Sequence, residues 1–202
     1  SACGKDIPVY NTTDQNYSIY LSDSTGNIAR VTMPDARIAD NNYYFTVNND
    51  NINGAVTWMK EFRDNIYLGI PSQYKVIVIN KFSFKKVGQF DFSVSQRIPT
   101  DMAFVNATNG YIAHENDSTI SLVDLYTFTV ARSVPSGKNP IAVAAIEQQV
   151  FVACKGDNTV CRIDSRTNSI VARYSTPPMP ALLNNIQDDN VAAEKRRLLL
   201  VC

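Results

Sequence analysis

Short apolar stretches alternate with polar turns along most of the chain. The clearest stretches form three pairs: 65–70 with 75–80, 110–114 with 118–124, and 150–154 with 158–164. Valine, isoleucine and aromatic residues dominate these stretches, while Gly, Asn, Asp and Ser separate them. Because β-branched and aromatic residues favour strands and the separating residues favour turns, the pattern predicts antiparallel hairpins. No helical periodicity of useful length competes with it.

The hairpins recur with a nearly constant period. An Asn or Asp ends each pair, at Asn80, Asp124 and Asp164, with spacings of 44 and 40 residues. A proline opens the following unit, at Pro99, Pro140 and Pro180, with spacings of 41 and 40 residues. Four short strands in about 40 residues is the period of a β-propeller blade. The sequence therefore predicts an all-β fold, a β-propeller of four-stranded antiparallel blades over residues 16–202, with about four and a fraction blades present.

The best copy of the repeat, residues 158–171, resembles the YVTN/YncE-like propeller repeats. The likeness covers residues 95–185 well and residues 17–94 loosely. It departs from the family in the second unit, where Asn80 stands for Asp and the turn carries the bulky Phe82 and Phe84. Members of that family usually close with seven blades, so the resemblance implies that this chain is a fragment of a seven-bladed propeller.

The first residues, Ser1-Ala2-Cys3, resemble the end of a bacterial lipoprotein signal, in the style of Bacteroidota surface lipoproteins. The resemblance implies lipidation of Cys3, a lipoprotein N-terminus and tether over residues 1–15, and an outer-membrane or cell-surface location. An accidental cysteine near the N-terminus is the alternative. No apolar run approaches the roughly 18–20 residues of a membrane span, so the lipid anchor would be the only membrane contact.

The composition argues against several classes of function. Lys+Arg and Asp+Glu both number 19, so the chain lacks the basic excess of a nucleic-acid-binding protein and we expect no such partner. One histidine, His114, and the absence of a Gly-x-Ser-x-Gly motif argue against a serine hydrolase. Cys154 and Cys161 do not have zinc-site spacing, so we expect no metal and no cofactor. The two cysteines flank one hairpin and are predicted to be packed thiols, with a disulfide as the alternative.

Propellers usually bind through loops at one mouth of the central channel. The register places the loops between second and third strands, and the connections between blades, on one such face. The candidate ligand-binding residues there are Tyr74, Arg97, His114, Glu115, Asp117, Lys138, Lys155 and Asp157. Their mixture of charges and amides suits a polar ligand or a protein partner. A solvated loop is the alternative for each residue, and for His114 a surface position or cross-strand pair.

These observations predict a non-enzymatic, surface-anchored binding module that captures a small polar ligand or docks on an outer-membrane protein. Bacteroidota propeller lipoproteins of similar style include cobalamin-capturing proteins, so nutrient capture is one form of this hypothesis. The alternative is a calcium-dependent, lactonase-like propeller hydrolase. That alternative would need carboxylates such as Asp101, Asp117 and Asp157 to converge in the channel, although Asp is common in turns anyway.

Overall fold

The computed structural model describes residues 18–33, 35–180, 182–186 and 197–201, and its strands form five antiparallel sheets. The N-terminal sheet contains β1 (Ser18–Ser22), β2 (Ile28–Thr32) and β3 (Arg37–Asp40). Blade A contains β4 (Trp58–Phe62), β5 (Asn65–Ile70), β6 (Lys75–Asn80) and β7 (Lys86–Asp91). Blade B contains β8 (Pro99–Phe104), β9 (Asn109–His114), β10 (Thr119–Asp124) and β11 (Thr129–Pro135). Blade C contains β12 (Pro140–Ile146), β13 (Gln149–Cys154), β14 (Thr159–Asp164) and β15 (Ser169–Ser175), and the C-terminal hairpin contains β16 (Leu182–Ile186) and β17 (Arg197–Val201).

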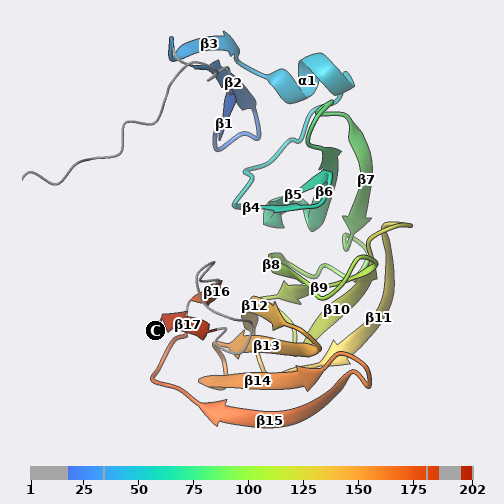
Figure 1. The fold of residues 1–202 in the computed structure, drawn as a ribbon, viewed down its shortest axis with the longest axis vertical. Helices are drawn as coiled ribbons and strands as arrows, with labels where there is room; N and C mark the ends of the chain where they lie inside the picture. Colours follow the sequence, from blue (N-terminus) through green and yellow to red (C-terminus); the bar gives the residue numbers. More distant parts are fainter. Residues whose placement is uncertain (1–17, 34, 181, 187–196, 202) are drawn as a thin grey trace, which may run out of the picture.

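This architecture confirms the predicted all-β partial propeller. Each complete blade is a meander in which consecutive strands pair. The blades follow one another along an open arc, with β8 and β12 on its inner side and β7, β11 and β15 on its outer side (Figure 1). The apolar cores lie within and between neighbouring blades, since each main cluster of buried side chains includes residues from two adjacent units.

The recurring Asn or Asp is a turn residue. Its side-chain oxygen accepts hydrogen bonds from backbone N–H groups two or three residues later, at Phe82 and Ser83 in blade A, at Tyr126 and Thr127 in blade B, and at Arg166 in blade C. The turn needs only an acceptor oxygen, so Asn80 serves as well as Asp124 or Asp164. The presence of Asn80 where the other two units have Asp therefore does not change this role in the turn.

The fifth residue of each of these turns joins one unit to the preceding one. Phe84, Phe128 and Asn168 occupy this position, and all three have a left-handed backbone. Phe84 stacks on Tyr20 of the N-terminal sheet, with ring centroids 4.6 Å apart. Between blades B and C, the Asn168 side chain accepts a 2.6 Å hydrogen bond from the Tyr111 hydroxyl. The bulky Phe84 is thus a structural contact between units.

Phe128 makes the same kind of contact against a glycine. A Cβ atom on Gly88 of β7 would lie 2.2 Å from the Phe128 ring, so only glycine fits beneath it. The equivalent position in blade B is Arg132, and the turn residue that follows it in blade C is the smaller Asn168. Gly88 therefore leaves room for the Phe128 ring of the next blade.

Replacement of Gly88 by Ala is expected to destabilise the protein by about 1–3 kcal/mol, because the Phe128 ring must move. The same substitution added to Phe128→Asn is expected to cost much less. Urea denaturation of the four proteins of this double-mutant cycle measures the difference. Equal costs of Gly88→Ala in both backgrounds would contradict the proposed packing.

The N-terminal unit departs from the prediction of four strands and no helix. Its sheet has three strands, followed by the helix α1 (Tyr43–Asn48), and blade A contains a short 3₁₀ turn, η1 (Pro71–Gln73). Local caps define α1: the Asn42 side chain accepts from the Phe45 N–H, and Asn49 ends the helix in a left-handed conformation. The buried Tyr44 attaches the helix to the core cluster it shares with blade A. The expectation of a uniform four-stranded unit is therefore wrong for this part.

Two further predictions concern the ends of the chain. Cys3 and the tether over residues 1–15 lie outside the described residues. The last copy of the repeat has the two strands expected of it, β16 and β17. Among the described residues, no helix has the length and hydropathy needed to cross a membrane.

Candidate ligand-binding face

The loops that join second and third strands lie at the same end of the blades as the blade-to-blade connections. We call this end the loop face. Arg97, in the connection between blades A and B, pairs with Asp117 in the β9–β10 loop, with Nε and Oδ2 2.8 Å apart. Its Nη1 also donates to the Ser133 hydroxyl on β11, at 2.7 Å. The connection is therefore held against the second half of blade B.

Blades B and C are joined on the loop face in the same way. Lys155 Nζ lies 3.8 Å from Glu115 Oε1. The backbone N–H of Lys138 donates to Asp157 Oδ2 at 2.6 Å, and the Asn139 amide donates to the Glu115 carbonyl at 2.6 Å. Charged residues selected from the sequence thus meet across blade boundaries, and the loops that carry them are fixed relative to one another.

Hydrogen bonding outweighs burial at Asp117. Burial raises the pKa of this carboxyl, but the Ser118 N–H, the Thr119 hydroxyl and Arg97 lower it further, and the net pKa lies below its ordinary value. Asp117 is therefore ionised at neutral pH. Of the other charged residues on the loop face, the Lys138 side chain is exposed and, within the described chain, pairs with no carboxylate.

His114 does not reach the loop face. It ends β9 with 0% of its surface exposed, its Nε2 2.8 Å from Ser121 Oγ on β10 and its ring 4.6 Å from the Phe92 ring. Burial, and then the nearby Arg97, lower the His114 pKa to about 3. A neutral, enclosed imidazole cannot contact a ligand on the surface, so the placement of His114 among exposed loop residues is corrected. His114 instead forms a cross-strand pair with Ser121, which was the alternative given for it.

Tyr74 is also apart from the ion pairs. It ends the short turn η1 in a left-handed conformation, and its half-buried side chain packs on the core between blades A and B. Tyr74 therefore lies at the edge of the loop face, where its ring packs against the core and forms no ion pair.

The two cysteines are free thiols in the interior of blade C, as predicted. Their sulfur atoms are 3.9 Å apart, and the strand register places Cys154 opposite Thr159 instead of Cys161. The pair occupies the position that His114 and Ser121 occupy in blade B. A hydrogen bond from Cys154 lowers the Cys161 pKa to about 6 against the effect of burial, assisted by Arg173, whose Nη1 lies 2.9 Å from the sulfur.

The carboxylates that a calcium-dependent hydrolase would need have other partners. Asp101, on the inner strand β8, forms a 2.6 Å ion pair with Lys60 and accepts a 2.9 Å hydrogen bond from the Val143 N–H of blade C. Asp117 and Asp157 belong to the loop-face contacts. In the part of the chain that the structure describes, no group of three or more His, Cys, Asp or Glu side chains is arranged to hold a metal.

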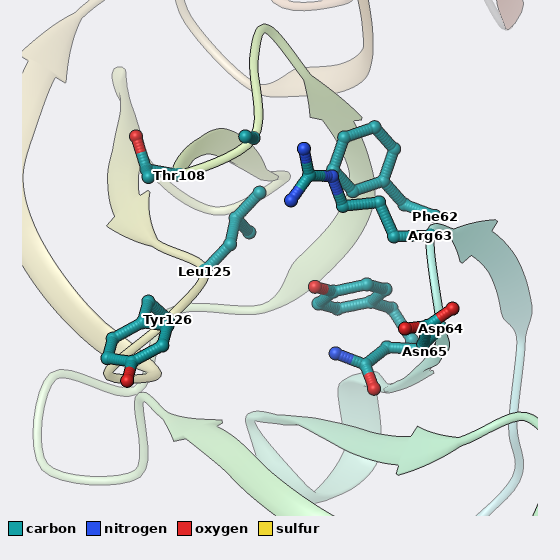
Figure 2. A pocket seen from close by; sticks show the side chains of 9 residues that line it. Phe62, Arg63, Asp64, Asn65, Thr108, Leu125 and Tyr126 are labelled. Carbon is teal, nitrogen blue, oxygen red and sulfur yellow. The ribbon is translucent and has the colours of Figure 1, made fainter.

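A hollow on the face opposite the loop face was not predicted from the sequence. It has a volume of about 250 Å³ and lies between the β4–β5 turn of blade A and the turns of blade B that carry Thr108 and Tyr126. Figure 2 shows the Arg63 guanidinium and the Asn65 amide turned towards Leu125 and Tyr126 across this hollow. The turns of blade B lie some 40 to 60 residues beyond the β4–β5 turn along the chain, so only the juxtaposition of the blades brings these segments together.

The comparisons with known proteins agree with the fold. The family described as Domain of unknown function (DUF5074) matches residues 7–201. Hydrazine synthase of Kuenenia stuttgartiensis is similar in structure, with a TM-score of 0.55 and 18% identity over 59% of this chain and 35% of that one. The computationally designed Ika8 protein has a TM-score of 0.65 and 12% identity over 85% of this chain and 50% of that one.

At these identities the structural matches establish the propeller-like fold alone. The chain spans half or less of the length of either structure. No curated protein matches the sequence.

Proposed function

We propose that this chain, which belongs to the DUF5074 family, is a non-catalytic binding module that captures a small polar ligand, or docks on a protein partner, through its loop face. The observation that carries the proposal is a set of ion pairs between loops of this face, Arg97 of the A–B connection with Asp117 of blade B, and Glu115 of blade B with Lys155 of blade C. These pairs hold the loops in one arrangement in the absence of a ligand. Preorganisation of this kind lowers the entropic cost of binding.

The chemistry of the loop face supports binding better than catalysis. The only nearby histidine, His114, is buried beneath the loop face and neutral, and the carboxylates of the face are engaged with cations or backbone N–H groups. Both signs of charge are present and the side chains project from different blades. Such a surface recognises a polar molecule by hydrogen bonds and ion pairs at several points.

The finer form of the proposal rests on the sequence resemblances. A lipid on Cys3 would hold the module at the outer membrane or cell surface of a Bacteroidota-type bacterium. A YncE-like propeller at the outer membrane would suit the capture of a nutrient such as a corrinoid, or docking on an outer-membrane transporter. Labelling with radioactive palmitate in a bacterial host, compared between the wild type and Cys3→Ser, tests the anchor.

Lys138 offers a clean test of the loop face, because only its backbone makes a contact across the blades. Isothermal titration with cyanocobalamin, haem and neutral oligosaccharides should find a saturable ligand. We expect Lys138→Ala to weaken that binding by about tenfold, the equivalent of about 1.4 kcal/mol. The matched control is Lys85→Ala, another exposed lysine at the opposite end of the blades.

Unchanged affinity in Lys138→Ala, together with weaker binding in Lys85→Ala, would place the site elsewhere. An absence of binding to all the small molecules would favour the docking form of the proposal. That form is tested by pull-down of outer-membrane proteins with the wild type and with Lys138→Glu.

A further inference from the structure

The hollow opposite the loop face, between blades A and B, has a rigid aromatic floor. Phe62 of blade A stacks on Phe104 of blade B, with ring centroids 4.4 Å apart and the rings within 5° of parallel. Tyr67 packs against the same Phe104 ring at 4.9 Å. These rings belong to strands, not to loops, so the floor keeps its shape in the absence of a ligand.

In the equivalent crevice between blades B and C, the polar groups form hydrogen bonds with one another. There the Tyr111 hydroxyl donates to Asn168, the Arg166 guanidinium donates to Asp164, and the Ser165 hydroxyl donates to the Gln148 carbonyl. Strand register shows that Tyr67 corresponds to Tyr111. Tyr67 lacks the partner that Tyr111 has, because Phe128 occupies the position of Asn168.

Arg63 and Asp64 of the A–B crevice are open to solvent, whereas Tyr67 is buried. Among the described residues, Arg63 forms no ion pair; its contact is with the Phe62 ring, 5.9 Å from the guanidinium carbon. Asp64, in the same turn, has an exposed carboxylate that also forms no ion pair within the described chain. The Asn65 side chain lies within hydrogen-bonding reach of the Tyr67 hydroxyl. Each of these last two can both donate and accept hydrogen bonds.

Tyr126 closes the other side of the hollow. Its side chain is 85% exposed, although it is a large aromatic ring that burial would stabilise. An exposed ring beside open hydrogen-bonding groups can bind a ligand that has an apolar face and a polar edge.

We propose that this crevice binds a neutral sugar ring, such as a terminal hexose of a glycan. The C–H face of the sugar lies against the Tyr126 ring, and its hydroxyl groups exchange hydrogen bonds with Arg63, Asp64 and Asn65. A hydroxyl group donates to the carboxylate and accepts from the guanidinium, so one neutral ligand satisfies both charges. A carboxylate ligand would be repelled by Asp64. The small volume matches a single ring, with a dissociation constant of about 1 mM.

Saturation-transfer NMR on the full chain with the methyl glycosides of glucose, galactose and mannose tests this site. We expect at least one glycoside to bind, and we expect Tyr126→Ala and Arg63→Ala each to weaken that binding by about tenfold. Both side chains are exposed, so neither truncation should disturb folding. Phe82→Ala is the matched control, since Phe82 occupies the position of Tyr126 in the turn of blade A and is 75% exposed.

Three results would overturn the inference. The first is an absence of saturation by any neutral glycoside. The second is equal loss of binding in Phe82→Ala and Tyr126→Ala, which would indicate nonspecific contact with exposed rings. The third is tighter binding of glucuronate than of methyl glucoside, which would show that Arg63 selects an anion in spite of Asp64. Because Lys138 lies on the other face, Lys138→Ala is expected to leave glycoside binding unchanged, and this separates the site from the proposed loop-face function.

Discussion

Acidification from pH 6.5 towards pH 3 is expected to lower the free energy of unfolding by about 1.4 kcal/mol per pH unit through His114. Burial, and then the charge of Arg97, lower its folded pKa from 6.5 to about 3. Between these two values the unfolded chain binds a proton that the native chain excludes. The native state is therefore penalised as the pH falls below 6.5, and this penalty is absent above that pH.

His114→Gln isolates this effect. The amide is neutral at every pH and can still form a hydrogen bond with Ser121, so we expect a lower stability at pH 7 but a shallower loss on acidification. Urea denaturation at pH 7 and pH 4.5 measures the two slopes. Carboxyls with lowered pKa values, such as Asp91 and Asp124, add to the acid sensitivity of both proteins alike. Equal slopes would show that folding does not lower the pKa of His114.

Asp101→Ala is expected to destabilise the protein by about 3 kcal/mol. Asp101 links three blades, because its carboxylate pairs with Lys60 of blade A and accepts from the Val143 N–H of blade C. Its removal leaves a buried N–H without an acceptor and deprives Lys60 of its counter-ion. Lys60 is partly exposed, so water recovers some of the loss.

Asp101→Asn provides the graded comparison. The amide oxygen can still accept from Val143, while the charge that pairs with Lys60 is lost, so we expect about half the cost of the alanine substitution. Chemical denaturation gives the stabilities, and hydrogen exchange at the Val143 amide reports on the shared contact. If Asp101→Ala cost no more than a surface substitution, the inner strands would not depend on this link.

The fold followed from the sequence because its signals are local. Strand pattern, turn chemistry and a period of about 40 residues are all properties of short segments. Asn80 illustrates this, since the turn needs only an acceptor within three residues. The helix α1 was missed because a six-residue helix defined by the caps Asn42 and Asn49 shows no periodicity.

The site was less predictable because it depends on contacts between blades. The strand register places His114 beside a loop, but its burial follows from Phe92, which comes from the preceding connection. Likewise, no local pattern shows that Arg63 lies opposite Tyr126. The pairing of Arg97 with Asp117 could be inferred from their opposite charges only once both loops had been assigned to one face.

Calorimetric titration distinguishes binding without turnover from catalysis. The protein is titrated with cyanocobalamin, neutral oligosaccharides and a lactone such as dihydrocoumarin, with calcium and then with EDTA, and each compound is recovered for mass measurement. We expect saturable heat for a polar ligand, no effect of EDTA and an unchanged ligand mass. Sustained heat from the lactone, with the gain of one water in the recovered product and loss of both in EDTA, would contradict the proposal of binding without turnover and establish a calcium-dependent hydrolase.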